Sequence, residues 1–359
     1  MGKGRLLFAA AGLMLSAAAT ADTPALRDPL TDPFFAADQG DTRGVLILDD
    51  GQVVAKRYQP GYSDGNRFIS WSMAKTVTGF LVGALVADGK LKLDDPAPIA
   101  EWHARPGDPR AAITLRQMMN MSSGLQHVEV GEPIENSDTN QILFVGGTND
   151  MAAREIAKPL EVKPGSLWKY SSLTSLLLAE IVTRQLTTSH DPRVRAQAYR
   201  AFAEERLFRP AGITSAVLDF DGAGTQIGGS IIYMSLPDWG RFGMVLLDGK
   251  SPDGKTQIVS PDWLAFMKTP APTYAGYGGQ LWVNNPVPGE GQRYPGASTS
   301  VASAEGHLGQ HVVTSHDNGH GRGVVVVRLG NTREDISAKV NGRVIADALN
   351  HFPRDAAAH

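Results

Sequence analysis

The sequence predicts a protein of mixed α/β class, with strands near both ends of the chain and a largely helical region between them. Three observations support this prediction. A hairpin pattern covers residues 44–58, helical patterns broken by Pro and Gly fill residues 90–250, and β-branched runs return after residue 277. We therefore expect an antiparallel sheet built from both ends of the chain, flanked by helices, with a helical subdomain inserted between its strands.

The first strand pair is expected at residues 44–58, where an apolar run is followed by a turn signal at 49–52 and a second apolar run. Residues 22–43, rich in Pro, Asp and Ala, are expected to form an irregular lead-in. Residues 72–88 are almost all apolar and end at Gly89, which predicts a buried helix. Later helices are expected at 115–121, 150–157, 173–185, 195–207 and 336–352, and later strands at 279–284, 311–314 and 324–329.

These patterns predict one domain over residues 44–352. Its α/β part is expected over about 44–75 and 255–352, and its helical part over about 76–254. With 42% hydrophobic and 20% charged residues, the chain has the composition of an ordinary soluble globular protein.

Residues 1–21 have the pattern of a secretory signal peptide. A positively charged start is followed by an apolar run over residues 6–18 and a small-residue site at 19–21, with cleavage expected before Asp22. The apolar run is too short to span a bilayer, so we expect export to the periplasm or the exterior and no membrane anchor after cleavage. The chain contains no Cys, which excludes disulfides, thiol catalysis and thiolate metal sites.

Charge and motifs narrow the function further. The formal net charge is −3 and no basic block is present, so nucleic acid is not an expected partner. The sequence contains no H-E-x-x-H zinc motif, no phosphate-binding loop, no dinucleotide fingerprint and no G-x-S-x-G elbow. We expect no metal and no cofactor.

The most informative local pattern is Ser72 followed by Lys75 at the start of the apolar helix. On a helix, residues three apart share a face, so the lysine amine can reach the serine hydroxyl. A serine is a weak nucleophile until a neighbouring group takes its proton. Unpaired N–H groups at a helix start also favour developing negative charge. The same serine could simply cap the helix, and the two roles do not exclude each other.

The S-x-x-K spacing occurs a second time, at Ser166 and Lys169. There the serine follows a Pro-Gly turn signal and has β-branched and aromatic neighbours, so the two side chains need not share a face. Helix context therefore favours Ser72 as the nucleophile.

Several stretches together resemble the penicillin-recognising serine hydrolases, which include β-lactamases, D,D-peptidases and related esterases and amidases. The stretches that resemble the class C branch are residues 72–75, 113–125, 164–172, 228–243 and 306–310. The 228–243 stretch is especially similar to the relatives that hydrolyse 6-aminohexanoate oligomers and simple esters. The resemblance spans about residues 40–350. It implies the β-lactamase/D,D-peptidase-like fold, with Ser72 in the cleft between the sheet part and the helical part.

The resemblance also implies the roles of individual residues. Ser72 is expected to become acylated, with Lys75 and Tyr170 as its base pair; which of the two accepts the proton stays open. The oxyanion hole is expected from the main-chain N–H groups of Ser72 and Gln310.

Two departures from the β-lactamase pattern affect the expected substrate. Ser172 stands where the family has the asparagine of Tyr-x-Asn, and His307 stands where it has the lysine of Lys-Thr-Gly. Both positions, together with Gly309, are expected to contact substrate. A histidine is mostly neutral at pH 7 and holds an anion weakly, which favours esters or small amides over β-lactams.

We therefore predict an exported serine hydrolase that cleaves carboxylic esters or small amides through a Ser72 acyl-enzyme. The alternatives are a β-lactamase or D,D-peptidase and, from another class, a non-catalytic ligand-binding scaffold; loss of Ser72, Lys75 or Tyr170 would have indicated the scaffold, and all three are present. The natural substrate depends on loops 126–147 and 260–277, which the sequence does not place. The sequence also leaves the oligomeric state and the choice between periplasm and exterior open.

Overall fold

The computed structural model describes residues 28–316 and 321–352, and the side chains of residues 334–340 are outside the description. The predicted signal peptide, residues 1–21, and the first part of the lead-in, residues 22–27, also lie outside the described residues.

The central element is a six-stranded sheet in which every neighbouring pair is antiparallel. Its order is β2-β1-β9-β8-β7-β6, so β1, from the start of the chain, pairs with β9, from its end. This confirms the prediction of one sheet built from both ends of the chain. The strands are β1 Thr42–Asp49, β2 Gln52–Tyr58, β6 Trp282–Val283, β7 Ala302–Gly306, β8 Gln310–Ser315 and β9 Val324–Gly330.

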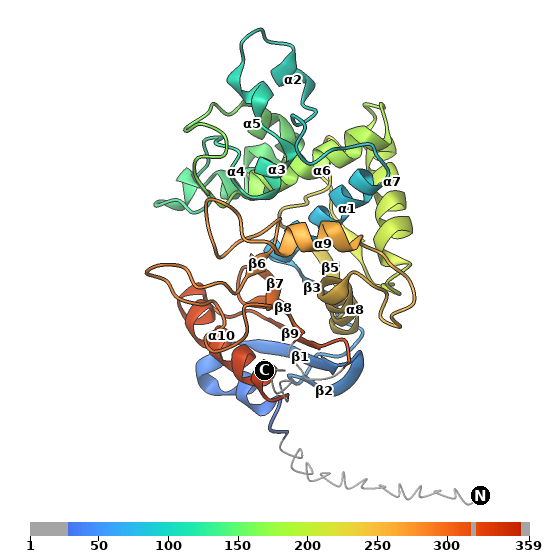
Figure 1. Cartoon of the computed structure of the whole chain (residues 1–359), viewed down its shortest axis with the longest axis vertical. Helices are drawn as coiled ribbons and strands as arrows, with labels where there is room; N and C mark the ends of the chain where they lie inside the picture. The colour runs from blue at the N-terminus through green and yellow to red at the C-terminus, as the bar shows by residue number, and fades with distance from the viewer. Residues whose placement is uncertain (1–27, 317–320, 353–359) are drawn as a thin grey trace, which may run out of the picture.

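The sheet is covered on both faces, as its central strand β9 shows, because every residue of β9 is buried. Side chains alternate between the two faces of a strand. In β9, Val325 and Val327 join the main core with α8 (Leu236–Asp248), whereas Val324 and Val326 join a second core with α10 (Glu334–Asn350). Figure 1 shows α8 and α10 on either side of the strands. A β-branched run that is buried on both faces therefore forms a central strand, and β9 lies between β1 and β8.

The helical part lies above the sheet in Figure 1 and packs around α1, which spans Ala74–Ala87. The main partner of α1 is α6, Ser172–Leu186, and nearly every side chain of both helices is buried. The other helices of this part are α2 Ala100–His103, α3 Leu115–Met119, α4 Asp138–Phe144, α5 Met151–Ala157 and α7 Pro192–Ala203, while α9 Pro261–Lys268 follows α8. A small second sheet of β3 Phe68–Ile69, β5 Ile232–Met234 and β4 Val217–Leu218 borders the start of α1.

The structure differs from the sequence predictions at several elements. Strand β7 was not predicted as a strand, and the strand expected over 279–284 is reduced to the two residues of β6. Two short 3-10 helices, Asp32–Phe35 and Ala37–Gln39, lie in the lead-in that was expected to be irregular. Helix α8 falls within the predicted helical part, 76–254, yet packs on the sheet, because its apolar stripe faces β1, β8 and β9.

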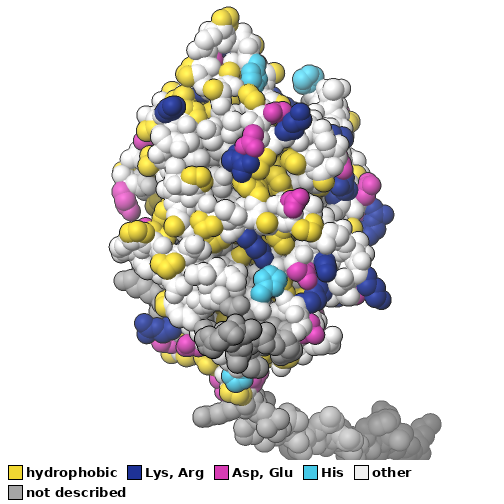
Figure 2. Space-filling model, in the orientation of Figure 1, with side chains coloured by type: hydrophobic (Ala, Val, Ile, Leu, Met, Phe, Trp, Pro, Cys, Tyr) yellow, Lys and Arg dark blue, Asp and Glu magenta, His cyan; other side chains and the backbone are white. Residues whose placement is uncertain are grey.

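The surface in Figure 2 shows Lys, Arg, Asp and Glu side chains interspersed over the face drawn, with hydrophobic side chains gathered across its middle. Within the described part of the chain, no helix is both long and apolar enough to cross a membrane.

Candidate active site

Ser72 lies in a 3-10 turn, Trp71–Met73, that leads directly into α1. The turn is held by Ser70, which donates its main-chain N–H to Ile232 O at 2.7 Å and accepts the Ile232 N–H on its Oγ at 2.9 Å. Trp71 has φ 43°, a left-handed conformation that is rare for a bulky residue. The Ser72 hydroxyl caps no helix: it contacts Lys75 and is half-exposed. The fold therefore presents Ser72 as an accessible hydroxyl.

Lys75 is the buried partner of Ser72, with 1% of its surface exposed. Its Nζ lies 3.0 Å from Ser72 Oγ, 2.8 Å from Ser172 Oγ and 2.6 Å from Gly229 O. An ammonium has three N–H donors, and these three oxygens can accept all of them. Burial lowers the pKa of Lys75 to about 8, although the negative charge of Glu129 raises it. A substantial fraction of this lysine is therefore neutral near pH 8 and able to accept a proton.

Tyr170 completes the predicted group of three. Its ring lies 4.8 Å from Lys75 Nζ, and its hydroxyl interacts with the Ser72 side chain. The preceding residue donates its N–H to Met121 O at 2.8 Å, and the following residue, Ser171, caps α6, so the segment is fixed on both sides of Tyr170. Burial raises the pKa of Tyr170 far above its usual value, and the charge of Glu129 adds to this effect. The structure thus brings Ser72, Lys75 and Tyr170 together, with a neutral tyrosine.

The second S-x-x-K pair does not form such a contact. Ser166 donates its hydroxyl to Lys163 O at 2.6 Å, and Lys169 pairs with Glu161. Ser166 lies on the exposed loop before α6, as its turn signals predict.

Ser172 has a different place from the predicted one. It was expected to contact substrate, but it is buried in the first turn of α6 behind Lys75. Its Oγ lies 2.8 Å from Lys75 Nζ and donates to Glu129 Oε1 at 2.6 Å. Ser172 therefore connects the lysine to a carboxylate.

Glu129 is the residue that the sequence interpretation missed. Its carboxylate accepts four hydrogen bonds: two from Ser172 (N 2.8 Å, Oγ 2.6 Å), one from His127 Nε2 (2.7 Å) and one from Thr139 Oγ1 (3.0 Å). Burial alone would raise its pKa, but these donors and the charge of Lys75 hold the pKa at about 2. Glu129 lies in the 126–147 loop, where no periodic pattern or motif pointed to it.

Gly229 shows why the lysine pocket needs a glycine. A Cβ at this position would lie 2.5 Å from Ser172 O, closer than real Cβ contacts allow. The glycine lets the chain pass α6 closely enough for Gly229 O to accept from Lys75 at 2.6 Å. The 228–243 stretch singled out by the resemblance thus contributes a main-chain acceptor to the site.

The 306–310 stretch forms the tip of the β7–β8 hairpin rather than one continuous strand. Gly306 ends β7 and packs against residues 70–73, the turn that carries the candidate nucleophile Ser72 and is called the nucleophile turn below. A Cβ added to Gly306 would lie 2.1 Å from Ser70 O. His307 is exposed and packs edge-on against Trp71, with ring centroids 5.3 Å apart. His307 and Gly309 were the predicted substrate contacts in this stretch, and His307 lies beside the nucleophile turn.

Gly309 and Gln310 are directed into the hairpin and the sheet instead. Leu308 (φ 61°) and Gly309 (φ 78°) make the tight turn, and Gly309 O accepts from the buried Arg328 at 2.7 Å. The Gln310 side chain donates to Gly330 O at 2.7 Å. The main chain of Gln310 pairs with that of Gly306, and Gly306 in turn packs against Ser70.

A wall of aromatic rings borders Tyr170. Trp168 stacks on Tyr274 with ring centroids 4.1 Å apart, and Tyr170 stacks on Trp282 at 5.5 Å. These four rings are half-exposed, and the buried Tyr277 packs behind them. Part of the wall comes from the 260–277 loop, which the sequence could not place.

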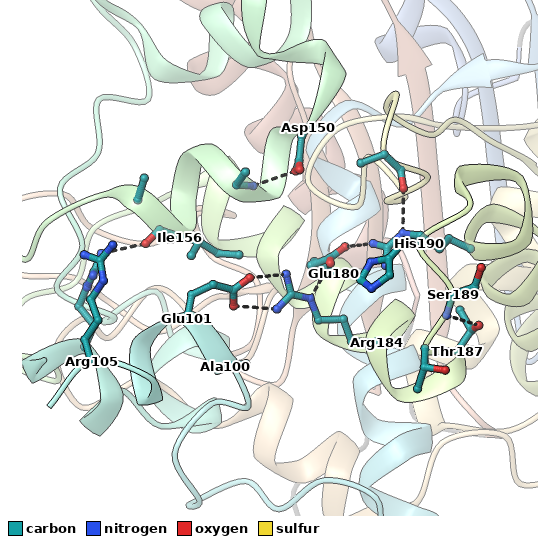
Figure 3. Close-up of a pocket in the computed structure, with 16 residues that line it drawn as sticks. Ala100, Glu101, Arg105, Asp150, Ile156, Glu180, Arg184, Thr187, Ser189 and His190 are labelled. Atoms are coloured by element: carbon teal, nitrogen blue, oxygen red, sulfur yellow. Dashed lines mark hydrogen bonds and ion pairs between the residues drawn. The ribbon is translucent and has the colours of Figure 1, made fainter.

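A cavity of about 830 Å³ lies in the helical part away from Ser72 (Figure 3). Four arginines line it, and three of them are in ion pairs: Arg110 with Asp108, Arg184 with Glu101 and Glu180, and Arg195 with Glu180. Among the side chains that the structure describes, no cluster of three or more acidic or histidine residues is suited to a metal.

The fold and the site define a class of protein: a serine β-lactamase or penicillin-binding-protein-like hydrolase. Comparison with known families agrees, since the Beta-lactamase family model matches residues 32–350. The chain belongs to this family, which confirms the resemblance inferred from its sequence.

Among individual relatives, the 6-aminohexanoate-dimer hydrolase of Paenarthrobacter ureafaciens is 26% identical over 62% of this chain and 56% of its own length. The chain thus spans about half the length of that curated relative. A Bacillus anthracis structure provisionally named 6-aminohexanoate-dimer hydrolase superposes with a TM-score of 0.69 at 20% identity, covering 91% of this chain and 84% of the other. The D-amino acid amidase of Ochrobactrum anthropi SV3 has a TM-score of 0.62 at 16% identity, covering 90% and 100%. At these identities the two structures establish the fold alone.

Proposed function

We propose that this protein is a serine hydrolase that cleaves carboxylic esters or small amides through an acyl-enzyme on Ser72. The observation that carries the proposal is the contact of an accessible hydroxyl with a buried lysine, 3.0 Å between Ser72 Oγ and Lys75 Nζ. Burial lowers the pKa of that lysine to about 8, so it can act as a base near neutral pH.

Lys75 is the better proton acceptor of the two candidates. A phenolate at Tyr170 is disfavoured because burial and the charge of Glu129 both raise the pKa of its hydroxyl. Neutral Lys75 takes the Ser72 proton while Oγ bonds to the substrate carbonyl carbon. When the tetrahedral adduct collapses, the leaving oxygen or nitrogen receives that proton, and the protonated Tyr170 lies beside Ser72 to pass it on. Water then releases the carboxylic acid and restores Ser72.

The negative oxygen of the adduct needs main-chain donors. The N–H of Ser72, at the start of α1, supplies one. For the second we propose the end of β7, Gly306–His307, in place of Gln310. The support is the close approach of Gly306 to the nucleophile turn, together with the pairing of Gln310 on the far side of that strand.

The surroundings of Ser72 favour an apolar acyl or leaving group. The half-exposed rings of Trp168, Tyr170 and Trp282 offer flat apolar surface close to the nucleophile. The amide hydrolysed by the Paenarthrobacter relative, as its name gives it, supports a small amide as one substrate. The leader-like residues 1–21 support action in the periplasm or outside the cell.

The test is hydrolysis of p-nitrophenyl acetate and butyrate by the mature protein, with a fluorophosphonate probe to label the nucleophile. We expect ester turnover and probe labelling, both lost in Ser72→Ala. The matched control is Ser166→Ala, which removes the serine of the second S-x-x-K pair and should change neither. If Ser72→Ala keeps wild-type activity, the nucleophile is wrong.

A panel of 6-aminohexanoate dimers, D-amino-acid amides and nitrocefin then distinguishes the substrate classes. Nitrocefin turnover comparable to ester turnover would favour a β-lactamase instead. The absence of both turnover and labelling in a folded protein would favour a non-catalytic scaffold.

A further inference from the structure

A chain of hydrogen bonds behind Ser72 begins at the buried Lys75 and ends in a half-buried carboxylate that the proposed reaction has not used. It runs from Lys75 through the hydroxyl of Ser172 to Glu129, with distances of 2.8 and 2.6 Å. We propose that Glu129 is a positioning residue for the reaction: through Ser172 it orients the Lys75 amine toward Ser72, and its negative charge sets the protonation of that amine. This inference rests on the serine hydrolase function proposed above.

The direction of the hydrogen bonds in this chain follows from the number of hydrogens. An ionised carboxylate only accepts hydrogen bonds, so the single hydroxyl proton of Ser172 points toward Glu129. The lone pairs of Ser172 Oγ then face Lys75, and the lysine must donate to them. Gly229 O also accepts from Lys75, at 2.6 Å.

This direction decides where the lysine lone pair points. A neutral Lys75 has two N–H donors, which Ser172 Oγ and Gly229 O use. The lone pair is then left for the third neighbour, Ser72 Oγ, at 3.0 Å. Glu129 therefore directs the base at the nucleophile without touching either the nucleophile or the substrate.

Glu129 is itself held firmly in place. His127, which is 1% exposed, donates to its Oε2, and so does Thr139 at the start of α4. The 127–138 loop closes on itself because Asp138 accepts the Val128 N–H at 2.9 Å and pairs with Lys158 at 2.6 Å. The carboxylate thus keeps one geometry while the reaction proceeds.

Several other charged groups lie around this chain, but among the described residues only the charge of Glu129 acts on the pKa of Lys75. His127 lies 3.9 Å from Asp138 through its other ring nitrogen. Helix α5 carries Arg154 and Glu155 on one side of the chain. Arg293 and Glu305 lie beyond Tyr170, next to the aromatic wall. Glu129 is the carboxylate whose charge acts on Lys75 most directly, since it raises the pKa that burial lowers.

The experiment measures the rate of fluorophosphonate labelling of Ser72 across pH 5.5–10 in wild type and Glu129→Gln. A glutamine amide has one acceptor where the carboxylate has two, so the Ser172 hydroxyl can turn and donate to the Lys75 lone pair. We expect the maximal labelling rate to fall at least about tenfold. We also expect the rising limb of the profile to move to lower pH, by on the order of one unit, because a negative charge near Lys75 is removed.

Two further variants separate orientation from charge. Ser172→Ala breaks the chain of hydrogen bonds but keeps the carboxylate. The maximal labelling rate should therefore fall, while the rising limb of the pH profile stays close to its wild-type position. Glu129→Asp keeps the charge on a shorter side chain, so its limb should stay near that of wild type. The matched control is Glu155→Gln, which neutralises a buried carboxyl on α5 that hydrogen-bonds Thr174 rather than Ser172; it should keep the wild-type rate and limb.

The proposal is overturned if folded Glu129→Gln labels at the wild-type rate, or if its rate falls with no movement of the limb, which would indicate a purely structural role. Should Glu129→Gln not fold, a Ser172→Ala variant that labels at the wild-type rate overturns it equally. Failure of the proposed function has a different result: wild type itself would not label, or Ser72→Ala would label as fast as wild type.

Discussion

At the residue scale, the candidate site centres on one buried lysine, Lys75, whose environment lowers its pKa. The hydrogen-bond partners of Lys75 among the described residues are two hydroxyls and a carbonyl oxygen, and none is a carboxylate. Burial therefore dominates and lowers its pKa to about 8. Glu129, one hydroxyl farther away, limits that decrease.

The pH dependence of ester hydrolysis should reflect this lysine. Lys75 is protonated and inactive as a base below its pKa, so we expect kcat/KM to rise with pH along a limb centred near 8. Lys75→Arg stays protonated throughout this range and should lose at least about a hundredfold in kcat/KM. A stopped assay with p-nitrophenyl butyrate, corrected for uncatalysed hydrolysis, measures both.

Lys268 provides a matched control for this prediction. It is a second buried lysine whose pKa burial lowers to about 8, but it lies on α9 and donates to Leu247 O. Lys268→Arg should leave the rising limb of the kcat/KM profile at its wild-type pH. A flat profile between pH 6 and 9, or a Lys75→Arg enzyme with full activity, would contradict the role given to Lys75.

The residues of the site differed in how well the sequence revealed them. Ser72 and Lys75 were predictable because helix geometry alone places residues three apart on one face. Tyr170 needed the order of several motifs along the chain. Glu129 had no local signal, since it meets Ser172 only when the 126–147 loop folds back over α6.

At the scale of elements, α8 approaches the sheet more closely than an ordinary helix can. Gly240 and Gly243 face β1 and β9, and a Cβ on either would lie 2.5 Å from Leu46 Cδ2 or 2.4 Å from Val325 Cγ1. Glycine weakens a helix by about 1 kcal/mol relative to alanine, so the close packing has to offset that cost. The glycines, rather than helix propensity, explain how α8 can lie in the main core.

Gly243→Ala tests this packing. The added methyl group meets well-packed side chains of the sheet, so we expect the free energy of unfolding to fall by about 1–2 kcal/mol, even though alanine favours the helix. Urea denaturation followed by circular dichroism measures the change. Gly146→Ala is the control, because a Cβ there meets nothing within 4 Å, and its stability should stay within about 0.5 kcal/mol of wild type. If Gly243→Ala were more stable than wild type, helix α8 could move away from the sheet without losing stability, and the close packing would not explain the glycine.

The predicted elements were most accurate where periodicity is strong. The hairpin at 44–58, the buried helix after Ser72 and the strand at 324–329 are all present. Strand β7 was missed because its residues, Ala302–Gly306, lack the β-branched pattern of a strand, and sheet pairing with β6 and β8 defines it instead.

At the scale of the whole molecule, the buried Arg328 joins the two ends of the chain to the site. Its guanidinium donates to Thr42 Oγ1 at 2.8 Å, to Gln39 O at 3.3 Å and to Gly309 O at 2.7 Å. It therefore links the lead-in and β9 to the turn of the β7–β8 hairpin, whose end packs on the nucleophile turn. Burial lowers the pKa of Arg328 to about 10, a sign that hydrogen bonds rather than an ion pair hold it.

Arg328→Lys should therefore weaken the whole fold. A lysine has three donors on one atom and cannot reach all of these acceptors, so buried oxygens lose their partners. We expect the free energy of unfolding to fall by about 2 kcal/mol or more, measured by thermal and urea unfolding. Arg209→Lys, at an exposed position, is the control and should behave as wild type. Equal stability of Arg328→Lys and wild type would mean that the two chain ends do not depend on this side chain.

The sequence by itself determined the family, the α/β class, and the contact between Ser72 and Lys75, because these depend on local periodicity and on the order of motifs. The tertiary structure decided what surrounds that pair: Ser172 lies behind Lys75, Gly306 packs against Ser70, and Glu129 accepts a hydrogen bond from Ser172. These contacts join residues 43, 97 and 236 positions apart. No local pattern encodes them, since they arise only when buried packing brings distant segments of the backbone together.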